Sequence, residues 1–175
     1  MHHAPIRIIT TGGTIDKVYF DAKSTYQVGC PNIKRVLEEL PVTVAYQITP
    51  LLQKDSLELT DADRQLLAAN VRSAEENQII VTHGTDTMVE SAMALADIEN
   101  KTIVFTGALE PAMFKTSDAI FNIGCAIAAV QALPAGIYIT MNGRIFPYDN
   151  VVKDVPNSRF VTRSELPHTT PPLTP

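Results

Sequence analysis

Threonine hydroxyls stand beside glycines at two places where a strand is expected to end. The first place is residues 11–15, TGGTI, where Gly12 and Gly13 would let the backbone turn sharply while Thr14 presents its hydroxyl. A tight turn with Thr14 as a turn or cap residue is the structural alternative, and it is the more common one for such a turn taken alone. The glycine spacing fits neither nucleotide-binding pattern, which argues against a nucleotide site.

The second place is residues 82–87, THGTDT, which gathers more functional groups. Thr85 offers a hydroxyl and Asp86 a carboxylate where the first amides of a helix would lack partners. Ordinary helix capping by Asp86 and Thr87 is the alternative, and the residues alone do not decide between the two. A lone histidine at a strand end, such as His83, is more typical of structural hydrogen bonding than of catalysis.

A parallel sheet is expected to position these segments. Short apolar runs alternate with segments of helical period along the chain, which is typical of β–α–β units. Residues 79–81 and 103–105 are apolar without a break, which predicts central strands covered on both faces, whereas the alternation over 42–48 predicts a strand nearer an edge. The fold class expected is therefore α/β, a three-layer open and mostly parallel sheet with helices on both faces in a single domain. The strands are expected over residues 6–10, 42–49, 78–82, 102–106 and 137–140.

Four helices are expected between these strands. One covers residues 33–40 and another begins near Thr60. Residues 87–90 have capping-box spacing, so a third helix should begin there. Residues 118–133 are apolar almost all round, which predicts a helix covered on both sides. The third helix should bury one stripe, namely Met88, Ala92, Leu95 and Ala96.

Composition excludes several classes of function. The chain has 175 residues with 14 Lys and Arg against 19 Asp and Glu, and its basic residues are scattered, so nucleic acid is not an expected partner. No apolar run approaches the roughly 20 residues that a bilayer span requires, so no membrane contact and a cytoplasmic location are expected. Cys30 and Cys125 lack CxxC spacing and are expected to be reduced thiols. No metal-ligand cluster is visible, and neither a metal nor a cofactor is expected.

The two threonine turns together resemble the signatures of the bacterial-type L-asparaginase family. Residues 23–29, KSTYQVG, look like its flexible active-site loop, and residues 17–29 are expected to form a lid. The resemblance covers about residues 6–160 in order, which is far more specific than either turn alone. Three further segments are similar to family segments: 54–56 (KDS) to the substrate-binding loop, 104–108 (VFTGA) to a glycine-alanine strand end, and 150–154 (NVVKD) to the segment with the catalytic lysine. The resemblance implies an asparaginase-like N-terminal α/β domain at 1–160, followed by an extended Pro/Thr-rich tail at 161–175.

What the resemblance implies is hydrolysis of an amide by a threonine nucleophile. Thr14 attacks the side-chain amide of L-asparagine, ammonia leaves, and water cleaves the β-aspartyl ester, with L-glutamine as a weaker substrate. A neighbour must take the hydroxyl proton, and the family suggests Thr14 with Tyr26, and Thr85 with Lys153 and Asp86. Enclosure favours a neutral, basic lysine while the carboxylate opposes it, so the acylated threonine stays open. On chemistry alone Lys153 is a solvated loop lysine and Tyr26 a loop aromatic covering apolar surface.

The resemblance also implies how the substrate is held. Asp86 takes the α-ammonium group, Ser56 and backbone amides take the α-carboxylate, and loop amides meet the developing oxyanion. A turn hydroxyl is the structural alternative for Ser56. The implied substrate-binding residues are Gly13, Asp55, Ser56, Gly84, Thr85, Asp86 and Ala108.

Departures from the family pattern leave other functions open. Family members usually have about twice this length and a second α/β domain that closes the site of a neighbouring subunit. A second copy of this chain is therefore expected to pack across the site, giving a homo-oligomer, a dimer or tetramer. Leu57 follows Ser56 where longer members have a polar residue. Two alternatives to the amidohydrolase are a regulatory module that binds asparagine or aspartate with little turnover, and an ammonia-producing subunit of an amidotransferase.

Overall fold

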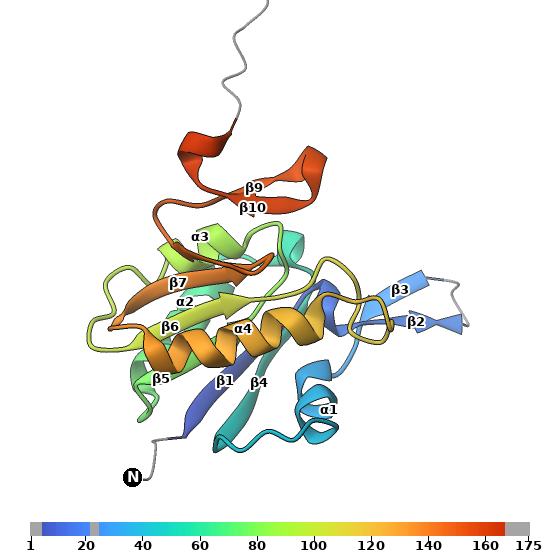
Figure 1. The fold of residues 1–175 in the computed structure, drawn as a ribbon, viewed down its shortest axis with the longest axis horizontal. Coiled ribbons are helices and arrows are strands. Elements are labelled where there is room, and N and C mark those ends of the chain that lie inside the picture. The colour runs from blue at the N-terminus through green and yellow to red at the C-terminus, as the bar shows by residue number, and fades with distance from the viewer. Residues whose placement is uncertain (1–4, 22–24, 167–175) are drawn as a thin grey trace, which may run out of the picture.

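A computed structural model of the chain describes residues 5–21 and 25–166, which fold around one six-stranded sheet (Figure 1). The strand order is β4-β1-β5-β6-β7-β8; all neighbours pair in parallel except β8, which is antiparallel to β7. The strands are β1 (Ile6–Gly12), β4 (Tyr46–Lys54), β5 (Gln78–Thr82), β6 (Thr102–Thr106), β7 (Gly136–Met141) and β8 (Arg144–Pro147).

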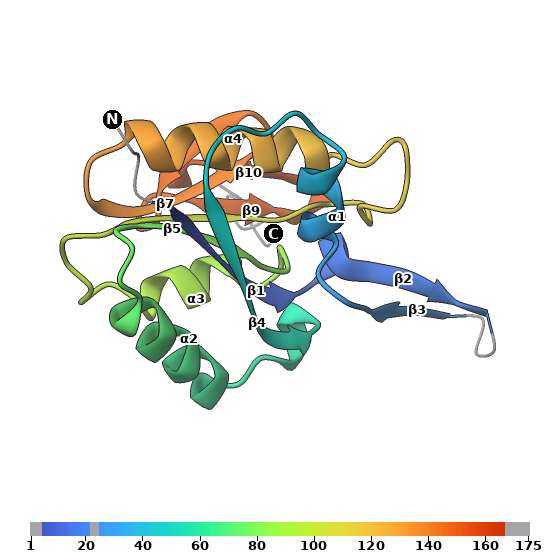
Figure 2. The same ribbon diagram turned by 90° about the horizontal axis from the view of Figure 1, so that it is seen from below.

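Helices cover both faces of the sheet, as the sequence predicts (Figure 2). One apolar cluster lies under α1 (Asn32–Glu38) and α4 (Ala119–Ala132), and the other lies under α2 (Asp61–Ser73) and α3 (Met88–Met93). Successive residues of a strand point to opposite faces, so Ile80 belongs to the first cluster while Ile79 and Val81 belong to the second. This explains why the central strands are apolar without a break. The three-layer, mostly parallel α/β fold in one domain is confirmed.

The edge strand lies further along the chain than the sequence predicts. The alternating pattern predicts it over 42–49, but β4 runs from Tyr46 to Lys54. Val42 and Val44 instead pack, partly buried, against the cluster under α1 and α4 from the connection before the strand. Their alternation therefore reflects packing of a loop, while the predicted edge position of the strand is confirmed.

Two details of the predicted helices are wrong. The capping box at 87–90 does not form, because the hydroxyl of Thr87 donates to the carbonyl of Ser56 at 2.7 Å. Helix α3 ends at Met93, so the chain turns before Ala96, which is exposed.

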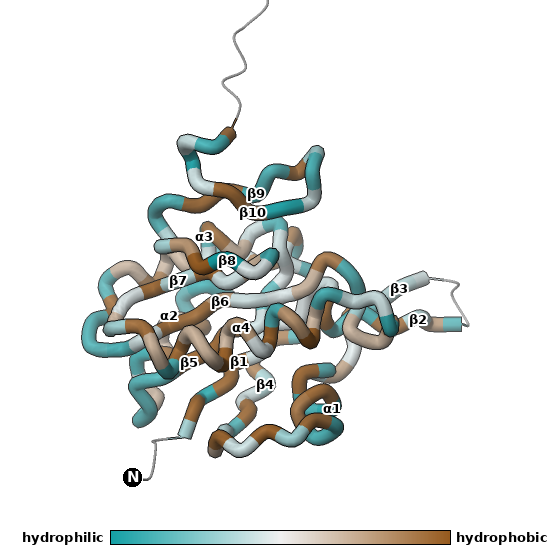
Figure 3. Tube along the Cα trace, in the orientation of Figure 1, coloured by the Kyte–Doolittle hydropathy of each residue, from teal (hydrophilic) through white to brown (hydrophobic). Residues whose placement is uncertain are grey.

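Helix α4 is not covered on both sides. Its inner face, including Ile123 and Val130, is buried, but Ile120 is 54% exposed and Phe121 is 59% exposed. The helix packs on the sheet by one face, and no described element covers the other (Figure 2). Figure 3 shows that hydrophobic residues colour long stretches of α1 and α4.

Two antiparallel hairpins are absent from the sequence-based expectations. One pairs β2 (Lys17–Phe20) with β3 (Thr25–Val28), in the segment expected to be a lid, where Lys23 and Ser24 lie outside the described residues. The other pairs β9 (Val152–Asp154) with β10 (Arg159–Val161). A short 3-10 helix, Arg163–Glu165, continues past the expected domain end at 160, and residues 167–175 of the expected tail lie outside the described residues.

Candidate active site

Glycines bring the loops after β1, β4 and β5 into direct contact. Gly13 has a φ of +87°, and a Cβ atom built on it would collide with the backbone of Gly84. A Cβ on Gly84 would in turn lie 2.6 Å from the hydroxyl oxygen of Ser56. Only glycine permits this approach. Three predicted site residues, Gly13, Gly84 and Ser56, are thus stacked, with Thr14 and Thr85 next along the chain.

Lys153 reaches this junction from β9. Its Nζ donates to Oγ1 of Thr85 at 2.8 Å and lies 2.6 Å from Oδ1 of Asp86. The lysine side chain is 16% exposed, and the backbone of β9 is held in register because Lys153 pairs with Phe160 of β10. Lys153 is therefore not a solvated loop lysine. The structure brings Thr85, Asp86 and Lys153 together, and Asp86 uses its carboxylate on the lysine.

Thr14 and Tyr26 are not joined by a hydrogen bond. Thr14 lies partly buried at the start of a 3-10 helix (Thr14–Asp16), and its hydroxyl has no hydrogen-bond partner within residues 5–21 and 25–166. Tyr26 is 48% exposed in β3, and its ring packs edge-on against Tyr19 and Phe114, with centroid distances of 5.5 Å and 6.1 Å. The hairpin thus holds Tyr26 by aromatic contacts.

Asp16 is a buried carboxyl that sequence reasoning did not single out. Its Oδ1 accepts the backbone N–H of Asn32 at 2.7 Å, and its carbonyl accepts the N–H of Gly29 at 2.8 Å. Burial raises the pKa of Asp16 to about 7, although the hydrogen bond from Asn32 opposes the shift. Asp16 and Gly29 bracket the β2–β3 hairpin, so Asp16 fixes the base of the hairpin two residues after Thr14. Its place directly after TGGTI was the available signal.

Asp55 is engaged by protein groups. Its carboxylate accepts the N–H of Leu57 at 3.1 Å, as the cap of the 3-10 helix Ser56–Glu58, and lies 2.8 Å from Nζ of Lys17. Burial alone would raise the pKa of Asp55, but the Lys17 and Leu57 hydrogen bonds and the charge of Lys153 together hold it below its usual value. The Lys17 contact ties the β2–β3 hairpin to the loop after β4.

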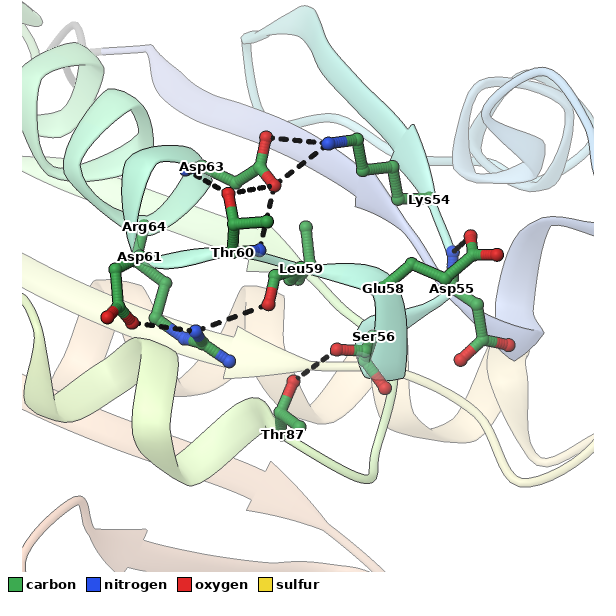
Figure 4. Close-up of polar contacts among 10 residues, drawn as sticks. All are labelled: Lys54, Asp55, Ser56, Glu58, Leu59, Thr60, Asp61, Asp63, Arg64 and Thr87. Carbon is green, nitrogen blue, oxygen red and sulfur yellow. Dashed lines mark hydrogen bonds and ion pairs between the residues drawn. The ribbon is translucent and has the colours of Figure 1, made fainter.

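Capping interactions hold Ser56 in place. Ser56 is 2% exposed, and its carbonyl accepts the hydroxyl of Thr87 (Figure 4). Downstream, Thr60 caps α2 reciprocally with Asp63, whose carboxylate also accepts two hydrogen bonds from Lys54 at 2.9 Å (Figure 4). Both ends of the 54–60 segment are thereby fixed.

His83 and Ala108 have structural surroundings. The ring nitrogens of His83 contact the carbonyl of Gly84 and the hydroxyl of Ser91, each at 2.7 Å. Burial lowers the pKa of His83 to about 4, so the ring is neutral at pH 7. Ala108 is buried beyond β6 and follows Gly107, on which a Cβ would collide with the carbonyl of His83.

Two clefts flank the junction. One, of about 490 Å³, lies between the β2–β3 hairpin and the loop after β4 and is lined in part by Tyr26, Asp55 and Leu57. The other, of about 340 Å³, lies between α3 and β9 and is lined in part by Asp86 and Lys153. Within the described residues there is no cluster of three or more His, Cys, Asp or Glu side chains that could hold a metal ion. In the same ranges no helix has the length and hydropathy needed to cross a membrane.

Two curated relatives illustrate the similarity of this chain to known proteins. It is 32% identical over 144 residues to a subunit of the glutamyl-tRNA(Gln) amidotransferase of Haloquadratum walsbyi, covering 78% of this chain and 33% of that protein. It is 30% identical over 162 residues to the glutaminase-asparaginase of Acinetobacter glutaminasificans, covering 85% of this chain and 49% of that protein. The chain thus spans a third to a half of the length of these relatives.

Comparison with solved structures and families agrees. The crystal structure of a probable cytoplasmic L-asparaginase from Campylobacter jejuni superposes with a TM-score of 0.78 and 25% identity, covering 91% of this chain and 53% of that chain. The family model described as "Asparaginase, N-terminal" matches residues 5–163. That match takes in both threonine turns, the Ser56 loop and Lys153, and this chain therefore belongs to the asparaginase family.

Proposed function

We propose that this chain provides the nucleophile-bearing domain of an amidohydrolase that converts L-asparagine to L-aspartate and ammonia, with L-glutamine as a weaker substrate. The observation that carries the proposal is the lysine that donates to both Thr85 and Asp86 where Gly13 and Gly84 touch. Hydroxyl, ammonium and carboxylate groups in one small volume are what hydrolysis of an amide through an ester requires.

Thr14 is the proposed nucleophile. Its hydroxyl oxygen bonds to the side-chain carbonyl carbon of the substrate while its proton passes to a neighbouring base. The carbon–nitrogen bond then breaks, the nitrogen takes a proton and leaves as ammonia, and water cleaves the resulting β-aspartyl ester to aspartate and free Thr14. The unengaged Thr14 hydroxyl supports this assignment, because Oγ1 of Thr85 already accepts a hydrogen bond from Lys153.

The proton acceptor comes from one of two sets. In the first, Tyr26 takes the Thr14 proton after the β2–β3 hairpin moves over the site. In the second, Thr85 relays a proton to Lys153, which requires the lysine to give up an ammonium proton first. The 2.8 Å contact between Lys153 and Thr85 supports the second set.

Substrate recognition is proposed to use the same edge of the sheet. Asp86 would hold the α-ammonium group, Ser56 and adjacent amides the α-carboxylate, and the Gly13 and Gly84 loops with Ala108 the remaining backbone contacts. In the described structure Asp55 acts through Lys17 and Leu57, so we propose that it shapes the loop instead of touching the substrate.

An ammonia assay tests the proposal. The 175-residue chain should release ammonia steadily from L-asparagine, and Thr14→Ala should abolish the release. Thr43→Ala, an equal truncation of an exposed threonine outside the site, is the matched control and should keep full activity. Saturable binding of asparagine without ammonia release would favour the regulatory module instead.

A second candidate is the ammonia-producing subunit of an amidotransferase. It is favoured by the 32% identity to a protein of that kind from Haloquadratum walsbyi. In that case the chain would co-purify with a synthetase-like or tRNA-binding partner, and ammonia release would rise in the complex.

We include self-association in the proposal, as a dimer or tetramer. Ile120 and Leu40 line one apolar hollow of about 270 Å³ beside α4, and Phe121 is exposed on the same helix. Helix α4 has no charged residue, so a second copy of the chain can meet this face without like-charge repulsion. A cytoplasmic location belongs to the same proposal and is supported by the similarity to the probable cytoplasmic enzyme of Campylobacter jejuni.

A further inference from the structure

The cleft between the β2–β3 hairpin and the loop after β4 is larger than the proposed reaction needs. Its volume of about 490 Å³ lies in the range of roughly 300 to 1,000 Å³ typical of sites for drug-sized ligands, and free asparagine is much smaller than such a ligand. The cleft is continuous with the proposed site, because Asp55 and Tyr26 line it and Ser56 is the next residue along the chain. Space therefore extends beyond the reacting amide.

One wall of this cleft is apolar and fixed. Leu57 is 73% exposed, the most exposed large hydrophobic side chain in the described part of the chain. It cannot turn inward, because Asp55 caps the 3-10 helix that carries it and Ser56 takes the buried position. Val28 and the ring of Tyr26 line the same cleft from the hairpin. Contact with an apolar group of a ligand would remove Leu57 from water.

The carboxylates near this wall are already paired. Asp55 lies 2.8 Å from Nζ of Lys17, and Asp86 lies 2.6 Å from Nζ of Lys153. The carboxylate of Glu58 accepts the backbone N–H of Asp55 at 3.4 Å. A free α-ammonium group would have to compete with two lysines, whereas an acylated α-nitrogen is neutral and needs no carboxylate.

We infer that this cleft takes asparagine whose α-nitrogen carries an acyl or peptidyl group, and that Leu57 is a specificity-determining residue for such substrates. The inference rests on the proposed amide hydrolysis. The reacting side-chain amide stays at Thr14, and the acyl group lies along Leu57 and Val28. The bonds made and broken are those of the proposed reaction, and the acyl bond is not cleaved.

Kinetics with N-acetyl-L-asparagine and L-asparagine test the inference on the whole chain. We expect kcat/KM for ammonia release to favour the acetylated amide by about tenfold or more, and Leu57→Gln to reduce that ratio by a similar factor. Leu66→Gln is the matched control, since Leu66 is 45% exposed on α2 away from the cleft, and it should leave the ratio unchanged. Equal or better use of free asparagine, or a ratio that Leu57→Gln does not alter, overturns the inference while leaving the proposed hydrolysis intact.

Binding separates this inference from failure of catalysis. If neither amide is hydrolysed, calorimetry on the Thr14→Val variant compares N-acetyl-L-aspartate with L-aspartate. Tighter binding of the acetylated compound, weakened by Leu57→Gln, supports the cleft assignment although the proposed reaction fails. Tighter or equal binding of L-aspartate, or no binding of either compound, overturns it.

Discussion

At the scale of single residues, the site depends on two kinds of contact. Glycines let three loops touch at Gly13, Gly84 and Ser56, and one lysine joins the hydroxyl of Thr85 to the carboxylate of Asp86. The glycine pattern was visible in the sequence because each glycine stands directly after an apolar strand. The position of Lys153 followed only from the resemblance, because 67 residues separate it from Asp86 and nothing local marks it.

Gly13→Ala should damage both folding and activity. The new methyl group would collide with Gly84 at a φ of +87°, so we expect a loss of about 1 to 3 kcal/mol in the free energy of unfolding. Urea denaturation followed by circular dichroism measures it. Gly124→Ala is the control: it lies in α4 with no heavy atom within 4 Å of the added Cβ, and it should gain about 0.5 to 1 kcal/mol. Equal effects at the two positions would contradict the contact between the loops.

Lys153→Met should remove activity and leave the fold. The variant loses the donor to Thr85 and Asp86, so ammonia release should fall by about a hundredfold or more. Asp86 is 43% exposed and stays solvated, so stability should change by no more than about 1 kcal/mol. Lys34→Met, on the exposed surface of α1, is the matched control for ammonia release and for thermal unfolding. Full activity in Lys153→Met would exclude the lysine from the mechanism.

At the scale of elements, the sequence predicts what local patterns encode. β5 and β6 have the predicted bounds because unbroken apolar runs are specific to buried central strands. The hairpins escaped prediction because strands of three or four residues are too short to establish an alternation. Their anchors, such as Lys17 on Asp55 and Asn32 on Asp16, depend on contacts between segments that the fold brings together.

The hairpin anchor predicts a dependence of stability on pH. The folded pKa of Asp16 is raised to about 7 from 3.8, so its contribution is fully present below about pH 4 and is lost as pH rises toward 7. Asp16→Asn keeps an oxygen for the Asn32 N–H but does not ionise. The variant should gain stability relative to the parent between about pH 4 and pH 7, on the order of a few kcal/mol.

The difference between the two proteins isolates Asp16, because His83 acts in the opposite direction. The pKa of His83 is lowered to about 4 from 6.5 by burial, so its contribution is lost as pH falls through that range, equally in both proteins. Urea denaturation at closely spaced pH values provides the comparison. A constant difference between parent and variant from about pH 4 to about pH 8 would contradict the assignment.

At the scale of the whole molecule, the chain matches a third to a half of each of the two curated relatives described above. One side of its candidate site is bounded by a hairpin and exposed apolar side chains, including Tyr26 and Leu57. Packing of a second copy was expected from the resemblance to two-domain proteins. The exposed face of α4 was not, because its continuous apolar pattern predicts a helix buried on both sides.

Light scattering after size exclusion tests self-association. At low micromolar concentration the mass should be a multiple of 19.1 kDa, and Phe121→Lys should shift it toward the monomer by placing charges on the neutral α4 face. Tyr19→Lys changes an exposed aromatic in the hairpin and controls for general solubility effects. A parent protein that runs strictly as a monomer would contradict the proposal.

The central claim is that Thr14 becomes acylated beside Thr85 and Lys153. Mass spectrometry of the chain trapped with an electrophilic asparagine analogue, followed by peptide mapping, tests it most directly. The account predicts one adduct on Thr14 that is absent from Thr14→Ala and slowed in Lys153→Met. An adduct on Thr85, or none on either threonine while ammonia is still released, would contradict it.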